Sequence, residues 1–189
     1  YLEERAIYDV QINSYYNNVL RQEDLPQDTY DFVPTFLEAR GIQITQDRVF
    51  SLYLPEASQF HNRNKYDFPV VAVALSDYNA IRQMLGYPPI SLGAREFSTQ
   101  WDAISTPEDQ AAFLRNHPTL STDAGTLSLA QDALHTESMG ETFYNLYTHV
   151  TYVLPDQVCH QLLPVMTKRY LATAHPIPYA DAAALQDAF

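Results

Sequence analysis

The chain has 189 residues and a formal net charge of −12, from 11 basic and 23 acidic side chains. At this length one domain, or two tightly packed lobes, buries roughly 70% of the surface that the unfolded chain exposes, so the fold needs no disulfide staples. Nucleic acid and other polyanionic partners are disfavoured, because they require clustered Lys and Arg and the basic residues here are scattered.

Strand and helix patterns alternate from the start of the chain. Residues 6–14 alternate apolar and polar side chains, which predicts a strand. Residues 28–40 have apolar side chains at helical spacing, and Gly41 is suited to the turn that ends a helix. Two short strands are then expected at 42–45 and 49–54.

Residues 69–92, PVVAVALSDYNAIRQMLGYPPISL, are the most informative stretch. Residues 69–75 have no polar break, which predicts a strand covered on both faces. Ser76 stands where an N-cap belongs, and apolar residues recur at helical spacing after it. Gly86, followed closely by two prolines, predicts a left-handed residue that ends this helix. A short strand is expected to follow.

The second half of the chain continues the alternation. A strand is expected at 96–101, and Thr106 is a predicted N-cap for a helix that runs to about Arg115. Further strands are expected at 126–130, 148–154 and 169–173, and a helix that opens at Pro155-Asp156 is expected to carry Val158, Leu162, Leu163 and Met166.

The order of these elements predicts the fold class. It indicates an α+β domain in which a mixed β-sheet packs against helices. We expect a single domain over residues 1–189, with two lobes that meet near residue 103 as the alternative. No stretch approaches the roughly 20 apolar residues that cross a bilayer, so we expect a water-soluble domain.

Spacings typical of enzymes are absent from the sequence. It contains no GxSxG, SxxK, HExxH, GxxxxGK or GxGxxG pattern, and five glycines leave little material for a phosphate-binding loop. His135 and Glu137 place two ligand types on one side of a strand, but two ligands do not close a zinc site and no third is marked. We therefore predict no catalytic residue, no metal site and no cofactor.

The single cysteine, Cys159, excludes an intramolecular disulfide. It lies on the apolar side of the helix expected after Pro155, which predicts a buried thiol. His160 is adjacent in sequence, but consecutive side chains on a helix diverge by about 100° and do not face each other. A nucleophile and base pair is therefore not indicated.

Aromatic residues are numerous, with 14 Tyr and 9 Phe. Two groups of them are dense enough to form a contact surface of the kind that aromatic side chains supply at interfaces. The alternative is that the same side chains belong to the core. The candidate recognition residues are Tyr15, Tyr16, Phe143, Tyr144 and Tyr147.

Three stretches, taken in order, give the chain a family resemblance. They are YDVQIN at 8–13, the LSDYN unit with the ISL and REF segments after it, and VLPDQV at 153–158. Together they resemble the extracytoplasmic domain of FtsX-like ABC transporter permeases of Gram-positive bacteria. Residues 103–140 carry no such likeness.

The resemblance implies a non-catalytic domain at the extracellular face of the cell membrane, with membrane helices at both ends. The start at Tyr1 and the helical run at the C-terminus are what we expect of a loop domain taken from such a protein. A cytoplasmic ATPase subunit would act through the rest of the permease. The domain would bind a cationic peptide, a lipid-linked substrate or an extracellular partner protein.

Two other classes of protein stay open. The first is a secreted or surface-anchored binding or adhesion module, which would also be acidic, rich in aromatic residues and poor in motifs. The second is a hydrolase whose site leaves no mark in the sequence. The acidic charge itself has two interpretations, either solubility or attraction of cationic peptides.

Overall fold

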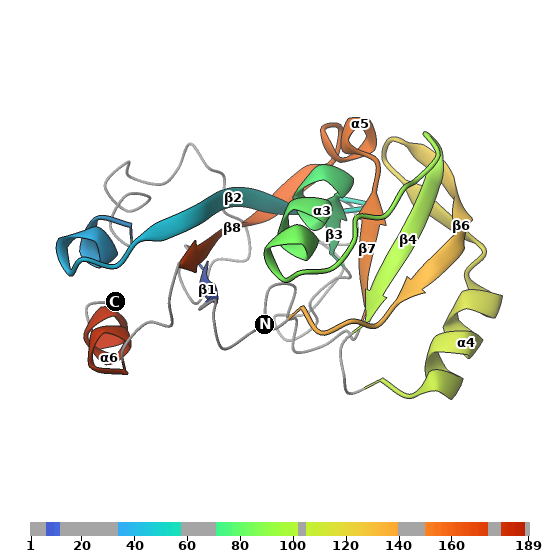
Figure 1. The fold of residues 1–189 in the computed structure, drawn as a ribbon. Helices are drawn as coiled ribbons and strands as arrows, with labels where there is room; N and C mark the ends of the chain where they lie inside the picture. The colour runs from blue at the N-terminus through green and yellow to red at the C-terminus, as the bar shows by residue number, and fades with distance from the viewer. Residues whose placement is uncertain are drawn as a thin grey trace.

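The computed structural model describes residues 7–11, 34–57, 71–101, 105–139, 150–173 and 179–187. Eight described strands form one sheet in the order β1-β8-β2-β3-β7-β4-β6-β5 (Figure 1). The pairs β3–β7 and β4–β6 are parallel, and the other described pairs are antiparallel. The chain therefore has the predicted α+β fold, a mixed sheet packed with helices.

The bounds of the elements are as follows. The strands are β1 (Ile7–Gln11), β2 (Ile44–Leu54), β3 (Ala72–Ala74), β4 (Glu96–Trp101), β5 (Thr119–Thr122), β6 (Gly125–His135), β7 (Val150–Leu154) and β8 (Leu163–Thr173). The helices are 34–39, α3 (Leu75–Met84), α4 (Pro107–Asn116), α5 (Asp156–Cys159) and α6 (Tyr179–Asp187). Residue 103 lies outside the described residues, and the strands before and after it, β4 and β6, are hydrogen-bonded neighbours.

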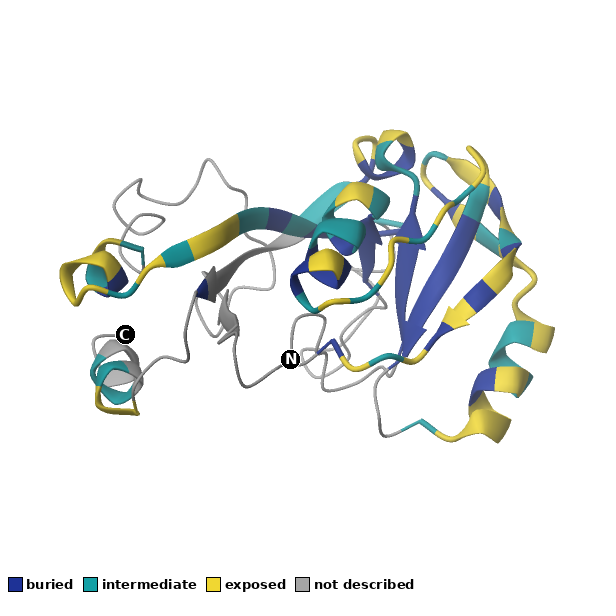
Figure 2. Ribbon diagram, viewed as in Figure 1, coloured by how far each residue is buried: buried dark blue, intermediate teal, exposed yellow. Residues whose placement is uncertain are grey.

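The middle of the sheet is buried on both faces (Figure 2). In β3, Val73 belongs to the core beneath α3, whereas Ala72 and Ala74 belong to the core that contains α5. β7 divides in the same way, with Val153 in the first core and Leu154 in the second. The predicted burial on both faces is confirmed for 72–74, because an apolar run without a polar break suits this position. Leu75, which the sequence pattern assigns to the strand, is the first residue of α3.

The C-terminal end of α3 forms as the sequence predicts. Gly86 has a φ of 86°, the left-handed conformation that glycine adopts without a Cβ penalty. The Gly86 amide donates to the carbonyl of Gln83 at 3.1 Å. The Tyr87 amide donates to the carbonyl of Arg82 at 2.8 Å. These two bonds are a Schellman motif, which satisfies carbonyls that the last turn leaves open.

The N-terminal end of α3 corrects the prediction that Ser76 is the N-cap. The helix begins at Leu75 with Ala74 as its cap residue, and the exposed Ser76 lies inside the first turn. The Ser76 amide donates to Oδ1 of Asp156 at 2.9 Å. The Ser76 amide has no acceptor within the helix, and the side chain of Asp156, at the start of α5, supplies one. Because Asp156 is 80 residues away in sequence, the local pattern cannot reveal this cap.

The predicted strand and helix at 96–115 are both confirmed. The strand is β4, and the helix is α4, which extends one residue beyond Arg115. The amide of Asp109 donates to Oγ1 of Thr106 at 3.1 Å, so Thr106 caps the helix and Pro107 occupies its first turn. Here the cap and the helix are neighbours in sequence, and the local pattern is sufficient.

Two expected elements have different bounds. The strands predicted at 42–45 and 49–54 are one strand, β2, with a register shift between Ile44 and Gln46 in its pairing to β8. Between the two apolar runs, Gln46 and Asp47 are exposed, and Arg48 is ion-paired with Asp77 of α3, with 2.7 Å between Nη2 and Oδ1. These polar residues do not interrupt the strand.

The helix expected after Pro155 is also shorter than predicted. α5 ends at Cys159, and Leu163 and Met166, which the sequence pattern assigns to the helix, lie in β8. Strand 169–173 is therefore the second half of an eleven-residue strand. Short apolar runs fit both periodicities, and pairing with β2 decides between them.

Beyond the buried middle of the sheet, three strands form an arm (Figure 1). We define it as β1, residues 44–49 of β2 and residues 168–173 of β8. Helix 34–39 and α6 lie at its far end, where Nε of Arg40 is 3.4 Å from Oδ1 of Asp181. The first described strand and the last are neighbours, since β1 pairs with β8 along its whole length.

The cap of α3 gives a testable prediction. Asp156→Ala is expected to lower the free energy of unfolding by about 1 kcal/mol, because it removes the acceptor of the Ser76 amide. Ser76→Ala is expected to change it by less than about 0.5 kcal/mol, because that hydroxyl is exposed and caps nothing. Urea unfolding followed by circular dichroism measures both. Gln157→Ala, an exposed neighbour, is the control, and a larger loss for Ser76→Ala than for Asp156→Ala would contradict the assignment.

Candidate functional site

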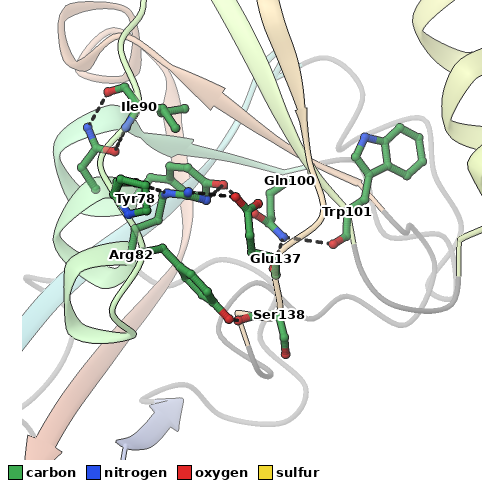
Figure 3. Close-up of polar contacts among 10 residues, drawn as sticks. Tyr78, Arg82, Ile90, Gln100, Trp101, Glu137 and Ser138 are labelled. Atoms are coloured by element: carbon green, nitrogen blue, oxygen red, sulfur yellow. Dashed lines mark hydrogen bonds and ion pairs between the residues drawn. The ribbon is translucent and has the colours of Figure 1, made fainter. Parts of the chain in front are cut away.

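Tyr78 and Arg82, two polar side chains of α3, turn toward the interior of the protein (Figure 3). Tyr78 and Arg82 are about one helical turn apart, and only 0% and 2% of their surfaces are exposed. Asn79 donates to the carbonyl of Ile90 and accepts from the Ile90 amide, both at 2.9 Å. Nε of Arg82 donates to the carbonyl of Pro88 at 2.7 Å. The helix therefore holds the loop that follows it through two side chains.

Five polar side chains meet beneath α3, and we call them the Arg82 cluster. The hydroxyl of Tyr78 donates to Oε1 of Gln100, at the end of β4. Nε2 of the Gln100 side chain donates to the backbone carbonyl of Trp101 at 3.0 Å and to that of Glu137 at 2.9 Å. The members of the cluster are Tyr78, Arg82, Gln100, His135 and Glu137.

Arg82 carries a charge in the centre of this cluster. Its Nη2 lies 3.0 Å from Oε1 of Glu137, and its Nη1 lies 3.4 Å from the Tyr78 hydroxyl. The guanidinium carbon also lies 5.6 Å and 5.5 Å from the ring centroids of Tyr78 and Tyr87. A buried charge costs several kcal/mol unless it is paired, so Glu137 is the partner that allows Arg82 to be buried.

The surroundings within the cluster set the protonation states of Tyr78, Glu137 and His135. Burial raises the pKa of Tyr78 to about 12, despite the opposing charge of Arg82. The hydrogen bond from Arg82 lowers the pKa of Glu137. Burial lowers the pKa of His135, and Arg82 acts in the same direction. At neutral pH the phenol is protonated, the carboxylate is ionised and the imidazole is neutral.

Two atoms of the cluster are buried without a hydrogen-bond partner. Among the described residues, these are Nε2 of His135 and Oε2 of Glu137, and Oγ of Ser98 is a third such atom elsewhere on β4. His135 is 5% exposed. An unpaired buried polar atom costs about 1–3 kcal/mol, so this part of the cluster is its least stable part.

The residues after β6 are held to α3 and to the loop after it by further contacts. The hydroxyl of Tyr87 donates to the carbonyl of Ser138 at 2.9 Å. Met139 is 4% exposed and belongs to the core beneath α3. Together with the Arg82 to Glu137 ion pair, these contacts make residues 137–139 an anchor that joins β6 to the helix.

The structure confirms the predicted burial of Cys159. Its side chain is fully buried, and burial raises its pKa to about 12, with the charge of Asp156 adding to the effect. His160, the next residue, is exposed. The thiol is therefore protonated at neutral pH and separated from solvent, which makes it unreactive in the folded protein.

Two of the residues weighed as site residues lie in the Arg82 cluster, and the five candidate recognition residues lie outside the described residues. His135 and Glu137, weighed as two ligands of a metal, are both in the Arg82 cluster, where Glu137 is occupied by Arg82. In the part of the chain that the structure describes, no group of three or more His, Cys, Asp or Glu side chains is placed to hold a metal ion. The five aromatic residues predicted to form a recognition surface, Tyr15, Tyr16, Phe143, Tyr144 and Tyr147, lie outside the described residues.

Sequence reasoning missed three members of the cluster, Tyr78, Arg82 and Gln100. One pattern in the sequence points to two of them. Tyr78, Ile81 and Arg82 share one helical face, so burial of the apolar Ile81 implies burial of its polar neighbours. Gln100 had no such indication, because its partner Glu137 is 37 residues away.

Comparisons with known proteins found no relative of this chain. No family model, no curated protein and no solved structure matches the chain. Over the described residues, the structure has no helix that is both long enough and apolar enough to span a membrane.

Arg82 gives the second prediction. Arg82→Met is expected to lower the free energy of unfolding by about 3 kcal/mol, because Glu137 and the carbonyl of Pro88 lose their donor. Arg82→Lys keeps the charge but loses the planar fork, so roughly half of that loss is expected. Thermal and urea unfolding measure both changes. Arg115→Met, at an exposed site on α4, is the matched control, and an equal effect at both positions would contradict a special role for Arg82.

Proposed function

We propose that this chain is a non-catalytic extracellular domain of an FtsX-like ABC transporter permease. In this role it binds a substrate or partner outside the cell. It couples that binding to movement of membrane helices, which a separate cytoplasmic ATPase drives. The observation that carries the proposal, beside the sequence resemblance, is the pairing of β1 with β8.

A domain inserted between two membrane helices must enter and leave at one face of the membrane. The neighbouring strands β1 and β8 are compatible with this requirement, since Ile7 lies opposite Ala172. Beyond β8 the chain continues into α6, and the ion pair between Arg40 and Asp181 joins α6 to the segment that precedes β2. The arm therefore gathers the start and the end of the described chain in one place.

The arm is suited to carry force. β2 and β8 are paired from Ile44 opposite Thr173 to Leu54 opposite Leu163. Hydrogen bonds of an antiparallel pair are perpendicular to the strands, so a pull along the strands loads many of them together. Movement at the far end of the arm would reach the buried part of the sheet through this pairing.

The residues that carry the resemblance also support a scaffold role. In the LSDYN unit, Tyr78 bonds Gln100 and Asn79 holds Ile90. VLPDQV includes Asp156, which caps α3. These residues fix α3 to the sheet, so the proposal places cargo recognition elsewhere in the chain.

The location is testable with one added cysteine in the full-length protein. Tyr179 is 89% exposed, so Tyr179→Cys is expected to react with a membrane-impermeant maleimide added to intact cells. The buried thiol of Cys159 gives little background. We expect the labelled protein to stay in the membrane fraction after alkaline carbonate extraction.

Two controls make this experiment decisive. Gln161→Cys, at an exposed position near α5, should label in the same way, and the unmodified chain should not. Labelling only after the cells are made permeable would contradict an extracellular location. Labelled protein that carbonate releases, or that is found in the medium, would favour a secreted or surface-anchored binding module.

The acidic charge leads to a prediction about ligand type. With a net charge of −12, the chain is expected to bind a cationic amphipathic peptide more tightly than a charge-reversed control. The difference should shrink as salt rises, because screening acts over about 10 Å at 0.1 M. Titration of both peptides at two ionic strengths measures it. Equal affinity for the two, or none, would assign the charge to solubility and favour a partner protein.

A further inference from the structure

His135 is the member of the Arg82 cluster whose unperturbed charge changes near physiological pH. It is the last residue of β6, pairs with Gln100 of β4, and its ring centroid lies 6.4 Å from that of Tyr78. A ring N–H of His135 donates to the backbone carbonyl of Asp132, whereas Nε2 is buried without a partner among the described residues. The imidazole is thus enclosed on the α3 side and on the β4 side.

Burial and the charge of Arg82 oppose a second cation at this imidazole, whereas the carboxylates of Asp132 and Glu137 favour one. α3 contributes the phenol of Tyr78 and the guanidinium of Arg82, and β4 contributes only the neutral Gln100. β6, the strand of His135, contributes the exposed Asp132, and the residues after β6 contribute Glu137. One oxygen of Glu137 already accepts from Arg82. A protonated His135 would compete with Arg82 for the only carboxylate in the cluster.

We propose that His135 is an acid-sensitive latch, and that its protonation opens the Arg82 cluster and releases residues 137–139 from α3. Opening brings water to the imidazolium and separates it from Arg82. It breaks the hydrogen bonds that hold the anchor, including the Gln100 bond to Glu137 and the Tyr87 bond to Ser138. This inference does not depend on the proposed permease function.

The direction of the pH dependence follows from linkage. The pKa of His135 in the closed cluster lies below its ordinary value of 6.5, so the open form binds the proton more readily. The closed form is fully stable above pH 6.5 and loses stability as the pH falls toward the lowered value. The pKa of Glu137 is also lowered, from 4.5, so its contribution is lost only in more acidic solution. Within the cluster, only His135 acts between pH 6.5 and 4.5, and Asp77 of α3, whose pKa burial raises from 3.8, lies outside the cluster.

Trp101, the only tryptophan, is joined to the cluster through its backbone carbonyl, which accepts from Gln100, and its indole packs on Phe113 of α4. In the unmodified chain we expect its emission to shift to the red as the pH falls from above 6.5 to just above 4.5. Over the same range, amide exchange in a peptide that spans 131–139 should become several-fold faster after correction for intrinsic rates. A peptide from α4 should not change.

His135→Gln removes the titrating group and keeps a neutral polar side chain, so it should abolish both changes. His160→Gln, at an exposed position, is the matched control and should leave them intact. If the shift persists in His135→Gln, or if exchange at 131–139 in the unmodified chain is the same at both pH values, the latch is wrong. Should His135→Gln fail to fold, the exchange comparison in the unmodified chain still decides.

Discussion

The buried charge of Arg82 is the constraint on which the candidate site depends. A guanidinium that is 2% exposed must have hydrogen-bond acceptors in fixed places, and Arg82 finds them in Glu137, Pro88 and Tyr78. These partners come from the helix itself, from the loop after it and from the residues after β6. One side chain therefore sets the position of three segments.

The apolar core alone would fix these segments less precisely. Ile81 and Met84 of α3 pack on the sheet together with Val73 and Val153. Contacts of this kind depend on area and tolerate small displacements of a helix. The ion pair between Arg82 and Glu137 does not tolerate them, because separating the partners leaves a buried charge alone. The pair is better understood as fixing the placement of α3 than as adding net stability.

The sequence predicted those elements whose determinants are local. The double-sided burial of β3, the left-handed Gly86 and the Thr106 cap all follow from residues within one turn or one strand. The short strand expected after Gly86 does not form, since residues 87–93 contain no strand. Two other errors concern contacts over long separations. The cap of α3 comes from Asp156, and the strand character of Leu163 comes from pairing with Leu54 in β2. No local pattern encodes either contact.

The arm and the Arg82 cluster belong to one continuous packed path. β2 leaves the arm and enters the core through Phe50 and Leu52, which share a core with Tyr78 of α3. α3 is in turn bonded to Glu137. Continuity alone does not transmit a signal, since coupling requires an element with two discrete states that both ends can bias. The cluster supplies such an element if it opens and closes as one unit. Acid and strain from the arm would then act on the same equilibrium, and each would change the response to the other.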